Sequence, residues 1–159
     1  MNKHRLLEFL IEQLEKDMAA AIAAAKATYE AATHEESKPE NEYDTRGLEA
    51  SYLAGAQEKR VAEIEELLSI CKRLNIKSFA ENDPIAPTAL IEVEYKGKRS
   101  FLFVLPKGGG QSLRFENHSI QVITPASPLG GALIGLKVGD SALVEMGTTT
   151  KEYDILSIQ

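Results

Sequence analysis

The sequence predicts an α+β fold in which two long helices precede a small antiparallel sheet that carries one short helix. In the first half of the chain, apolar and small residues recur at alternating spacings of three and four, which is the heptad period of packed helices. After Lys77 the pattern changes to runs of apolar and alternating residues that indicate β-strands. We therefore expect a helical domain at residues 1–77 and a sheet domain at residues 78–159.

The first predicted helix carries a continuous stripe of apolar or small residues. Nothing in residues 4–33 breaks a helix, and alanine, the strongest helix former, dominates residues 18–27. The stripe consists of Leu7, Ile11, Leu14, Met18, Ala21, Ala25, Thr28 and Ala32. Since its later members are small, we expect the part of the helix nearer the bend to pack closely and to be slender.

A second stripe occupies the following helical segment and weakens toward Gly47 and Gly55. Its members, taken backward along the chain, are Leu74, Cys71, Leu67, Ile64, Val61 or Arg60, Gln57 and Leu53. Two apolar stripes joined by a short polar bend bury each other when they face inward, so we expect an antiparallel coiled-coil hairpin. The alternative is one bundle with the rest of the chain, which the charged outer positions disfavour.

Five strand candidates and one short helix follow the linker AENDPIAP. The strand candidates are residues 88–95, 100–106, 119–124, 141–146 and 151–158, the first two joined by the turn KGKR. In the helical segment, Ser127 can cap the N-terminus, Pro128 can begin the helix and Gly135 can end it. The triple glycine Gly108–Gly110 lacks the features of a phosphate-binding loop, so we interpret it as a loop between strands.

Composition excludes several classes of function. A net charge of -6 disfavours a surface for nucleic-acid phosphates, so we expect no sequence-specific DNA binding. No run approaches the roughly 18 apolar residues of a membrane span. The single cysteine, Cys71, cannot form an internal disulfide or a cysteine metal cluster, which indicates a small buried side chain and a cytoplasmic protein. The spacing of nucleophiles, histidines and acids reveals no self-contained active site.

The predicted bend, residues 34–45, concentrates negative charge. Its segment EESKPENEYD holds five carboxylates and one lysine. Part of this pattern is an ordinary helix start, because Ser37 and Glu40 form a capping box. The two glutamates before Ser37 lie at the end of the first helix, where the helix dipole disfavours negative charge. Their placement leaves open whether the bend serves only structure or also function.

The segment ITPASPLGGALIGLKVGD, residues 123–140, followed by a strand and KEYDILSI, is similar to the C-terminal domain of the Gre-factor family of bacterial transcription elongation factors. The predicted hairpin, with PENEYD at its bend, also resembles the coiled coil of that family. The resemblance covers nearly the whole chain. It implies an FKBP-like C-terminal domain and a factor that binds RNA polymerase through its secondary channel and modulates elongation.

The resemblance also implies a role for the bend carboxylates. In Gre factors they help to hold the second catalytic metal of the polymerase, which then cleaves a backtracked transcript. The candidates in this sequence are Glu36, Glu40, Glu42 and Asp44, of which Glu40 and Asp44 would bind Mg²⁺ only in the complex with polymerase. The protein itself would be a monomer without a tightly bound cofactor, would contact nascent RNA only indirectly, and would assist catalysis without being an enzyme.

The sequence departs from the family pattern at this bend. Cleavage factors carry an Asp and a Glu three positions apart before an Asn, whereas here Ser37 stands in the place of the Asp ahead of Glu40 and Asn41. Either Glu36 or Asp44 replaces the missing carboxylate and the protein stimulates cleavage, or it occupies the channel as a regulator or inhibitor without cleavage activity.

Other candidates remain open. Lys59 and Arg60 on the second helix could contact polymerase or RNA, and the alternative is a solvated helix face. A prolyl isomerase needs an aromatic-lined pocket, which a chain without Trp and with 6% aromatic residues is poorly equipped to form. A chaperone-like or dimerising arm would instead make the chain a tight homodimer.

Overall fold

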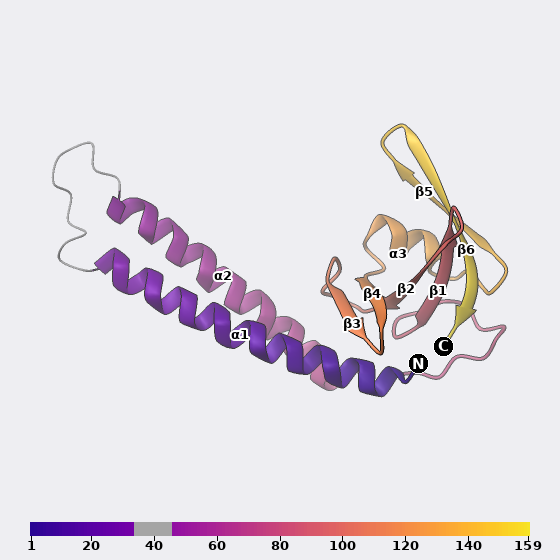
Figure 1. The fold of residues 1–159 in the computed structure, drawn as a ribbon, viewed down its shortest axis with the longest axis horizontal. Coiled ribbons are helices and arrows are strands. Elements are labelled where there is room, and N and C mark those ends of the chain that lie inside the picture. Colours follow the sequence, from indigo (N-terminus) through magenta and orange to yellow (C-terminus); the bar gives the residue numbers. More distant parts are fainter. Residues whose placement is uncertain (34–45) are drawn as a thin grey trace. The chain divides into compact units, whose positions relative to one another are not determined.

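The computed structural model describes residues 1–33 and 46–159 (Figure 1). Their secondary structure is α+β, as predicted. The helices are α1 (Lys3–Thr33), α2 (Arg46–Arg73) and α3 (Pro128–Leu133). The strands are β1 (Leu90–Tyr95), β2 (Lys98–Val104), β3 (Ser112–Phe115), β4 (His118–Ile123), β5 (Ser141–Met146) and β6 (Thr149–Ile158). Two compact units result: Met1–Phe9 with Leu74–Gln159 form the sheet unit, and Leu10–Arg73 form the helical unit.

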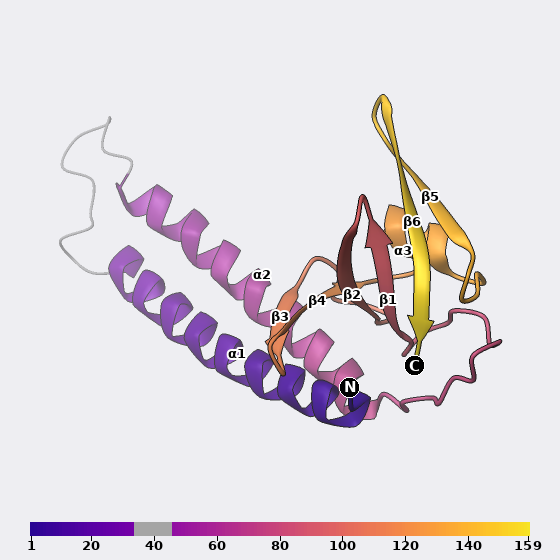
Figure 2. The same ribbon diagram turned by 45° about the vertical axis from the view of Figure 1, so that its right-hand side comes forward.

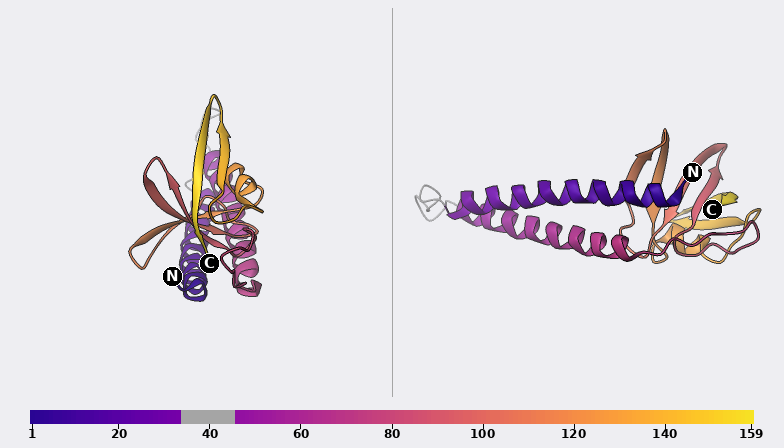
Figure 3. Two further views of the ribbon diagram at one scale, coloured as in Figure 1. Left: turned by 90° about the vertical axis from the view of Figure 1, so that its right-hand side faces the viewer. Right: turned by 90° about the horizontal axis from the view of Figure 1, so that it is seen from below.

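The helical unit is a pair of long helices. From Leu10 onward α1 lies beside α2, and the two run in opposite directions (Figures 1 and 3). The carboxylate of Glu15 on α1 lies 2.6 Å from the ammonium of Lys72 in the last turn of α2. This ion pair defines the register, so that residues farther along α1 face residues earlier in α2.

The predicted stripe of α1 faces the interior of this pair. Its buried or half-buried members in the helical unit include Ile11, Leu14, Met18, Ala21, Ala25 and Thr28. Larger side chains occupy the part near the start of the helix, and alanine and threonine occupy the later part. Because small residues bury little apolar area, the later part contributes less to the stability of the pair.

The stripe of α2 differs from the prediction at one end. Ile64 and Cys71 are buried as predicted, but Leu53 is 52% exposed while its neighbour Ala54 is only 6% exposed. The assignment of Leu53 to the stripe was therefore wrong. Ala54 lies seven residues, or about two turns, before the half-buried Val61, and so shares its face of the helix.

Gly55 lies in the interior of α2, where an added Cβ would meet no atom within 4 Å. Glycine in a helix interior destabilises by roughly 0.5–1 kcal/mol relative to alanine. We expect Gly55→Ala to raise the free energy of unfolding by about 0.5–1 kcal/mol in chemical denaturation. The reverse change at its exposed neighbour, Ala56→Gly, should lower it by a similar amount. A loss of stability in Gly55→Ala would contradict the open surroundings of this position.

The sheet unit is built on six strands in the order β3-β4-β2-β1-β6-β5 (Figure 2). The five strand candidates correspond to β1, β2, β4, β5 and β6. The sheet is mixed, however, and the prediction of an antiparallel sheet was wrong, because β2 and β4 pair in parallel, with Phe103 opposite Val122. The other strand pairs are antiparallel.

The strand that the sequence analysis missed, β3, explains the parallel pair. It forms a hairpin with β4, and this hairpin lies against β2 with β4 inside and β3 at the edge. The chain reverses its direction between β2 and β3 and again between β3 and β4. As a result, β4 runs in the same direction as β2. The turn between them is Glu116–Asn117, whose φ angles of +48° and +65° suit a type I′ turn. Asn117 at this turn was the feature of the sequence from which the hairpin could have been predicted.

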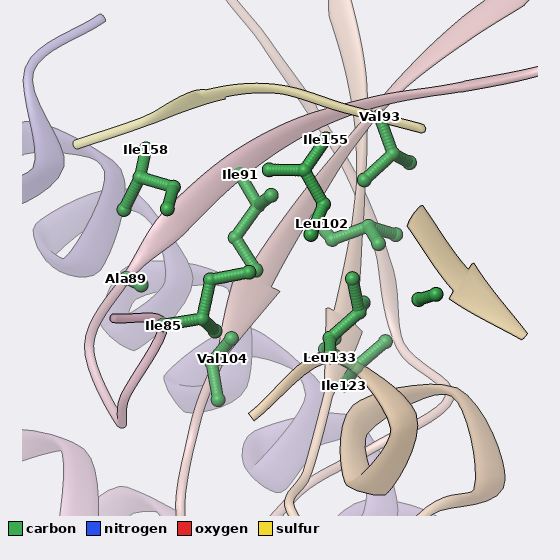
Figure 4. Close-up of a cluster of buried hydrophobic side chains, with 11 residues drawn as sticks. Ile85, Ala89, Ile91, Val93, Leu102, Val104, Ile123, Leu133, Ile155 and Ile158 are labelled. Carbon is green, nitrogen blue, oxygen red and sulfur yellow. The ribbon is translucent and has the colours of Figure 1, made fainter. Parts of the chain in front are cut away.

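Both faces of the sheet contribute buried side chains. On one face a cluster includes Leu133 of α3 and residues from β1, β2, β4 and β6 (Figure 4). On the other face Phe103 and Ile120 have no exposed surface. At its edge the ring of Phe115 lies 5.5 Å from that of Phe9, at the start of α1. The first turns of α1 therefore belong to the sheet unit.

Candidate functional site

The four predicted bend carboxylates lie outside the described residues. These are Glu36, Glu40, Glu42 and Asp44, and Ser37 lies among them. Metal binding by Glu40 and Asp44 thus stays a prediction. In the part of the chain that the structure describes, no group of three His, Cys, Asp or Glu side chains is placed to hold a metal ion. No described helix is both long enough and apolar enough to cross a membrane.

Lys59 and Arg60 are exposed on α2. An Arg60 guanidinium nitrogen lies 3.9 Å from a carboxylate oxygen of Glu63, one turn farther along. Exposed pairs of this kind contribute little to stability, so the charges are available to other groups. The same arrangement also suits a solvated helix face, and contact with polymerase or RNA stays a prediction.

The segment around α3 takes the predicted local structure. The Ser127 hydroxyl donates to the carbonyl of Thr124 over 2.7 Å and accepts from the N–H of Gly130 over 3.1 Å, so Ser127 caps the helix. Pro128 begins the helix, and Gly135 follows its end with a φ of +86° that favours glycine.

Sequence reasoning missed the importance of Gly130. An ideal Cβ at this position would lie 1.9 Å from the carbonyl oxygen of Thr124, far inside van der Waals contact. The glycine is therefore required by the close approach of α3 to the chain that precedes it. No local spacing signals this requirement, because it depends on how the turn before the helix folds back.

A cavity of about 1280 Å³ opens beside the start of α3. Its lining includes Ile123, Leu129, Val144, Lys151 and Tyr153, together with the Gly108–Gly110 loop. Among the lining residues that the structure describes, Tyr153 is the one aromatic residue. The cavity thus offers an apolar surface but lacks the aromatic lining that a prolyl isomerase needs. Sequence patterns could not reveal it, since separate segments of the chain form its walls.

Cys71 is buried, with 1% of its surface exposed. Burial raises the pKa of its thiol from 9.0 to about 11, so the thiol stays protonated at neutral pH. Since the thiolate is the reactive form, Cys71 is chemically inert there. This confirms its predicted role as a small buried side chain.

We expect the Cys71 thiol to make stability fall with rising pH between about pH 9 and 11, because the unfolded thiol loses its proton in this window while the folded one keeps it. Denaturation at several pH values should show a smaller decline in Cys71→Ala than in the original chain. The difference between the two slopes isolates the contribution of the thiol. Identical slopes would contradict the raised pKa.

Comparison with known proteins identifies relatives in both halves of the chain. Residues 115–159 match the family model of the C-terminal domain of the transcription elongation factors GreA and GreB. GreA of Rhodococcus erythropolis is 32% identical over 106 residues, which are 64% of this chain and 54% of that protein. The transcription inhibitor protein Gfh1 of Thermus aquaticus is 28% identical over 152 residues, which are 95% of this chain and 90% of Gfh1.

The chain thus spans about half the length of the GreA relative but nearly all of Gfh1. Among solved structures, GreA factor homolog 1 (Gfh1) of Thermus thermophilus has 23% sequence identity and a TM-score of 0.38, covering 99% of this chain and 94% of that one. Gfh1 of Thermus aquaticus has 27% identity and a TM-score of 0.39, covering 98% and 93%.

Proposed function

We propose that the chain is a divergent relative of the Gre factors, that it binds RNA polymerase through the secondary channel and that it regulates transcription. The observation that carries this proposal is the match of residues 115–159 to the GreA/GreB C-terminal domain. The alignment to a transcription inhibitor over 95% of the chain extends the relationship to the helical unit.

In this proposal the α1–α2 pair is the coiled coil that enters the channel. The sheet unit is an FKBP-like domain that docks at the rim of the channel. The helical unit suits that task physically. Its interior is formed by small residues along the later part of α1, and its outer positions, such as Glu12, Lys26 and Glu58, are charged and exposed. A slender helical pair with a charged surface stays hydrated inside a narrow, wet channel.

The bend would then act beside the active centre of the polymerase. Carboxylate oxygens are preferred ligands of Mg²⁺, so Glu40, together with Glu36 or Asp44, would share a metal ion with the polymerase. Hydrolysis with two metal ions needs both ions to be held on opposite sides of the reacting phosphate, and the bend would supply one side only. The protein would therefore assist catalysis as a partner of the polymerase and would not be an enzyme by itself.

Two forms of this function differ in what the bend does. In the first, the carboxylates stimulate cleavage of backtracked transcripts. In the second, the protein occupies the channel and inhibits synthesis without promoting cleavage. Ser37 in place of an aspartate favours the second form, as does an alignment that covers 95% of the chain with Gfh1 and only 64% with GreA.

A transcript-cleavage assay on a stalled, backtracked elongation complex tests the proposal. The original chain is compared with Glu36→Ala/Glu40→Ala/Asp44→Ala and with a control of equal charge change, Glu12→Ala/Glu58→Ala/Glu65→Ala, at exposed helix positions. Faster cleavage that only the bend variant loses supports the first form. Slower RNA synthesis without cleavage supports the second. Absence of binding to polymerase would overturn the proposal as a whole.

We also propose that the protein is a cytoplasmic monomer, because a narrow channel admits one helical pair. Sedimentation of the free protein should give the mass of one chain, 17.4 kDa. A tight homodimer that does not associate with polymerase would favour the dimerising arm instead.

A further inference from the structure

Strand β6 places a lysine in a row of side chains that faces the core of the sheet unit. Tyr153 packs against the buried cluster, and Lys151, two residues earlier on the strand, lies on the same face because side chains alternate. Its partner across β5 is Val144, which is 4% exposed, whereas the intervening Glu152 is exposed. The half-buried Lys151 is consequently among the residues that line the cavity of about 1280 Å³ beside α3.

The charge around Tyr153 is positive. The ring centres of Tyr95 and Tyr153 lie 5.1 Å apart. The ammonium of Lys151 lies 5.7 Å from the centre of the Tyr95 ring, and that of Lys96 lies 5.4 Å from it. Within residues 1–33 and 46–159, no carboxylate forms an ion pair with either ammonium. An aromatic ring attracts a cation through its π face but carries no net charge, so both ammonium groups are left without a counter-charge.

The cavity has apolar walls that come from separate elements. They are formed by Ile123 at the end of β4, Leu129 in α3 and Val144 in β5. A second lysine, Lys107, also belongs to the lining. Glu145 is the one acid among the described lining residues, but it follows Val144 on β5, so its exposed side chain extends from the opposite face of the strand. The site thus combines apolar walls with an ammonium that has no counter-charge.

We propose that this cavity binds an amphiphilic carboxylate, a small molecule in which an aliphatic chain ends in one negative charge. The chain lies between Ile123, Leu129 and Val144, where it buries apolar surface, and the carboxylate accepts a hydrogen bond from the Lys151 ammonium. Typical small-molecule cavities measure roughly 300–1,000 Å³, so this one is large enough to enclose such a chain. The inference goes beyond the regulation of transcription and does not depend on binding to polymerase.

The charge of the head group selects the ligand in this site. A carboxylate neutralises the Lys151 ammonium, a neutral alcohol does not, and a cation is repelled by Lys151 and Lys96. Beside apolar walls, solvent screens an ion pair less than it does on an open surface. One aliphatic chain with three different head groups therefore separates the contribution of the ammonium from that of the walls.

Titration of the full chain with octanoate, octanol and octyltrimethylammonium tests the ligand class, with amide NMR signals as the readout. We expect saturable binding of octanoate, about tenfold tighter than that of octanol, with the shifts concentrated at Ile123, Val144 and Tyr153. Octyltrimethylammonium should bind more weakly than octanol. Equal affinity for the three molecules, or octanoate shifts confined to other parts of the chain, would overturn the proposal.

Substitution of Lys151 tests the named contact. Lys151→Gln should weaken octanoate binding about tenfold and leave octanol binding unchanged, which shows at the same time that the cavity is intact. Lys151→Arg keeps the charge and the donors, so it should restore most of the affinity. Lys16→Gln makes the same charge change at an exposed position of α1 and should have no effect. If Lys151→Gln bound octanoate as tightly as the original chain, or if Lys16→Gln weakened binding equally, the proposal would fail.

An apolar protein segment is the alternative occupant of the cavity. The blocked peptide acetyl-Leu-Ala-Leu-amide, titrated under the same conditions, distinguishes the two. We expect it to bind more weakly than octanoate, because it has no charge to place at Lys151. Saturable binding of the peptide without binding of octanoate would make the cavity a surface for protein docking and would overturn the small-molecule proposal.

Discussion

Gly130→Ala is expected to lower the free energy of unfolding by about 3 kcal/mol or more. The added Cβ would lie 1.9 Å from the carbonyl oxygen of Thr124, 2.7 Å from its carbon and 2.9 Å from the Ser127 hydroxyl oxygen. Two of these atoms belong to the backbone, so no flexible side chain can move aside. Relief requires a shift of α3, which would also break the cap that Ser127 provides.

Chemical denaturation of the full chain measures this loss, and the next residue supplies the control. At Gly131 an added Cβ would meet only the carbonyl oxygen of Pro125, at 3.3 Å, which a small adjustment relieves. Gly131→Ala should therefore change stability by less than about 1 kcal/mol. Equal effects of the two substitutions would mean that the contact with Thr124 is not the reason for glycine at position 130.

Leu6→Ala is expected to lower the free energy of unfolding by about 2–5 kcal/mol. Leu6 has no exposed surface, and it lies in Met1–Phe9, the part of α1 that belongs to the sheet unit. Truncating it removes buried apolar surface and leaves a cavity that the surrounding residues cannot fill completely. Amide exchange in β3 and β4 should also become faster, because the same stretch of helix contacts Phe115 through Phe9.

Ile22→Ala is the matched control for this second experiment. Ile22 lies on the same helix but is 49% exposed, so its truncation should change stability by no more than about 0.5 kcal/mol. If Leu6→Ala were as mild as Ile22→Ala, or if it left exchange in the sheet unchanged, the first turns of α1 would not be part of that unit.

The candidate site was predictable to the extent that it depends on local composition. The acidic bend is visible as a run of charge, and the helix cap at Ser127 is visible as a short motif that the structure confirms. The cavity beside α3 was not predictable. Its lining residues Gly108 and Tyr153 are far apart along the chain, and no sequence period relates residues at such a separation.

The sequence by itself determined the elements whose causes are local. The spacing of apolar residues produced the interior face of α1, and the turn Lys96–Gly97 joined β1 to β2 with the positive φ angles of a tight hairpin. Tertiary structure alone decided how these elements combine. In the tertiary structure β4 pairs in parallel with β2, and Ala54 instead of Leu53 is buried in the interior of the helical unit. The close approach of Thr124 to position 130 leaves room only for glycine there. These outcomes depend on close packing between distant segments, which neither periodicity nor residue propensity specifies.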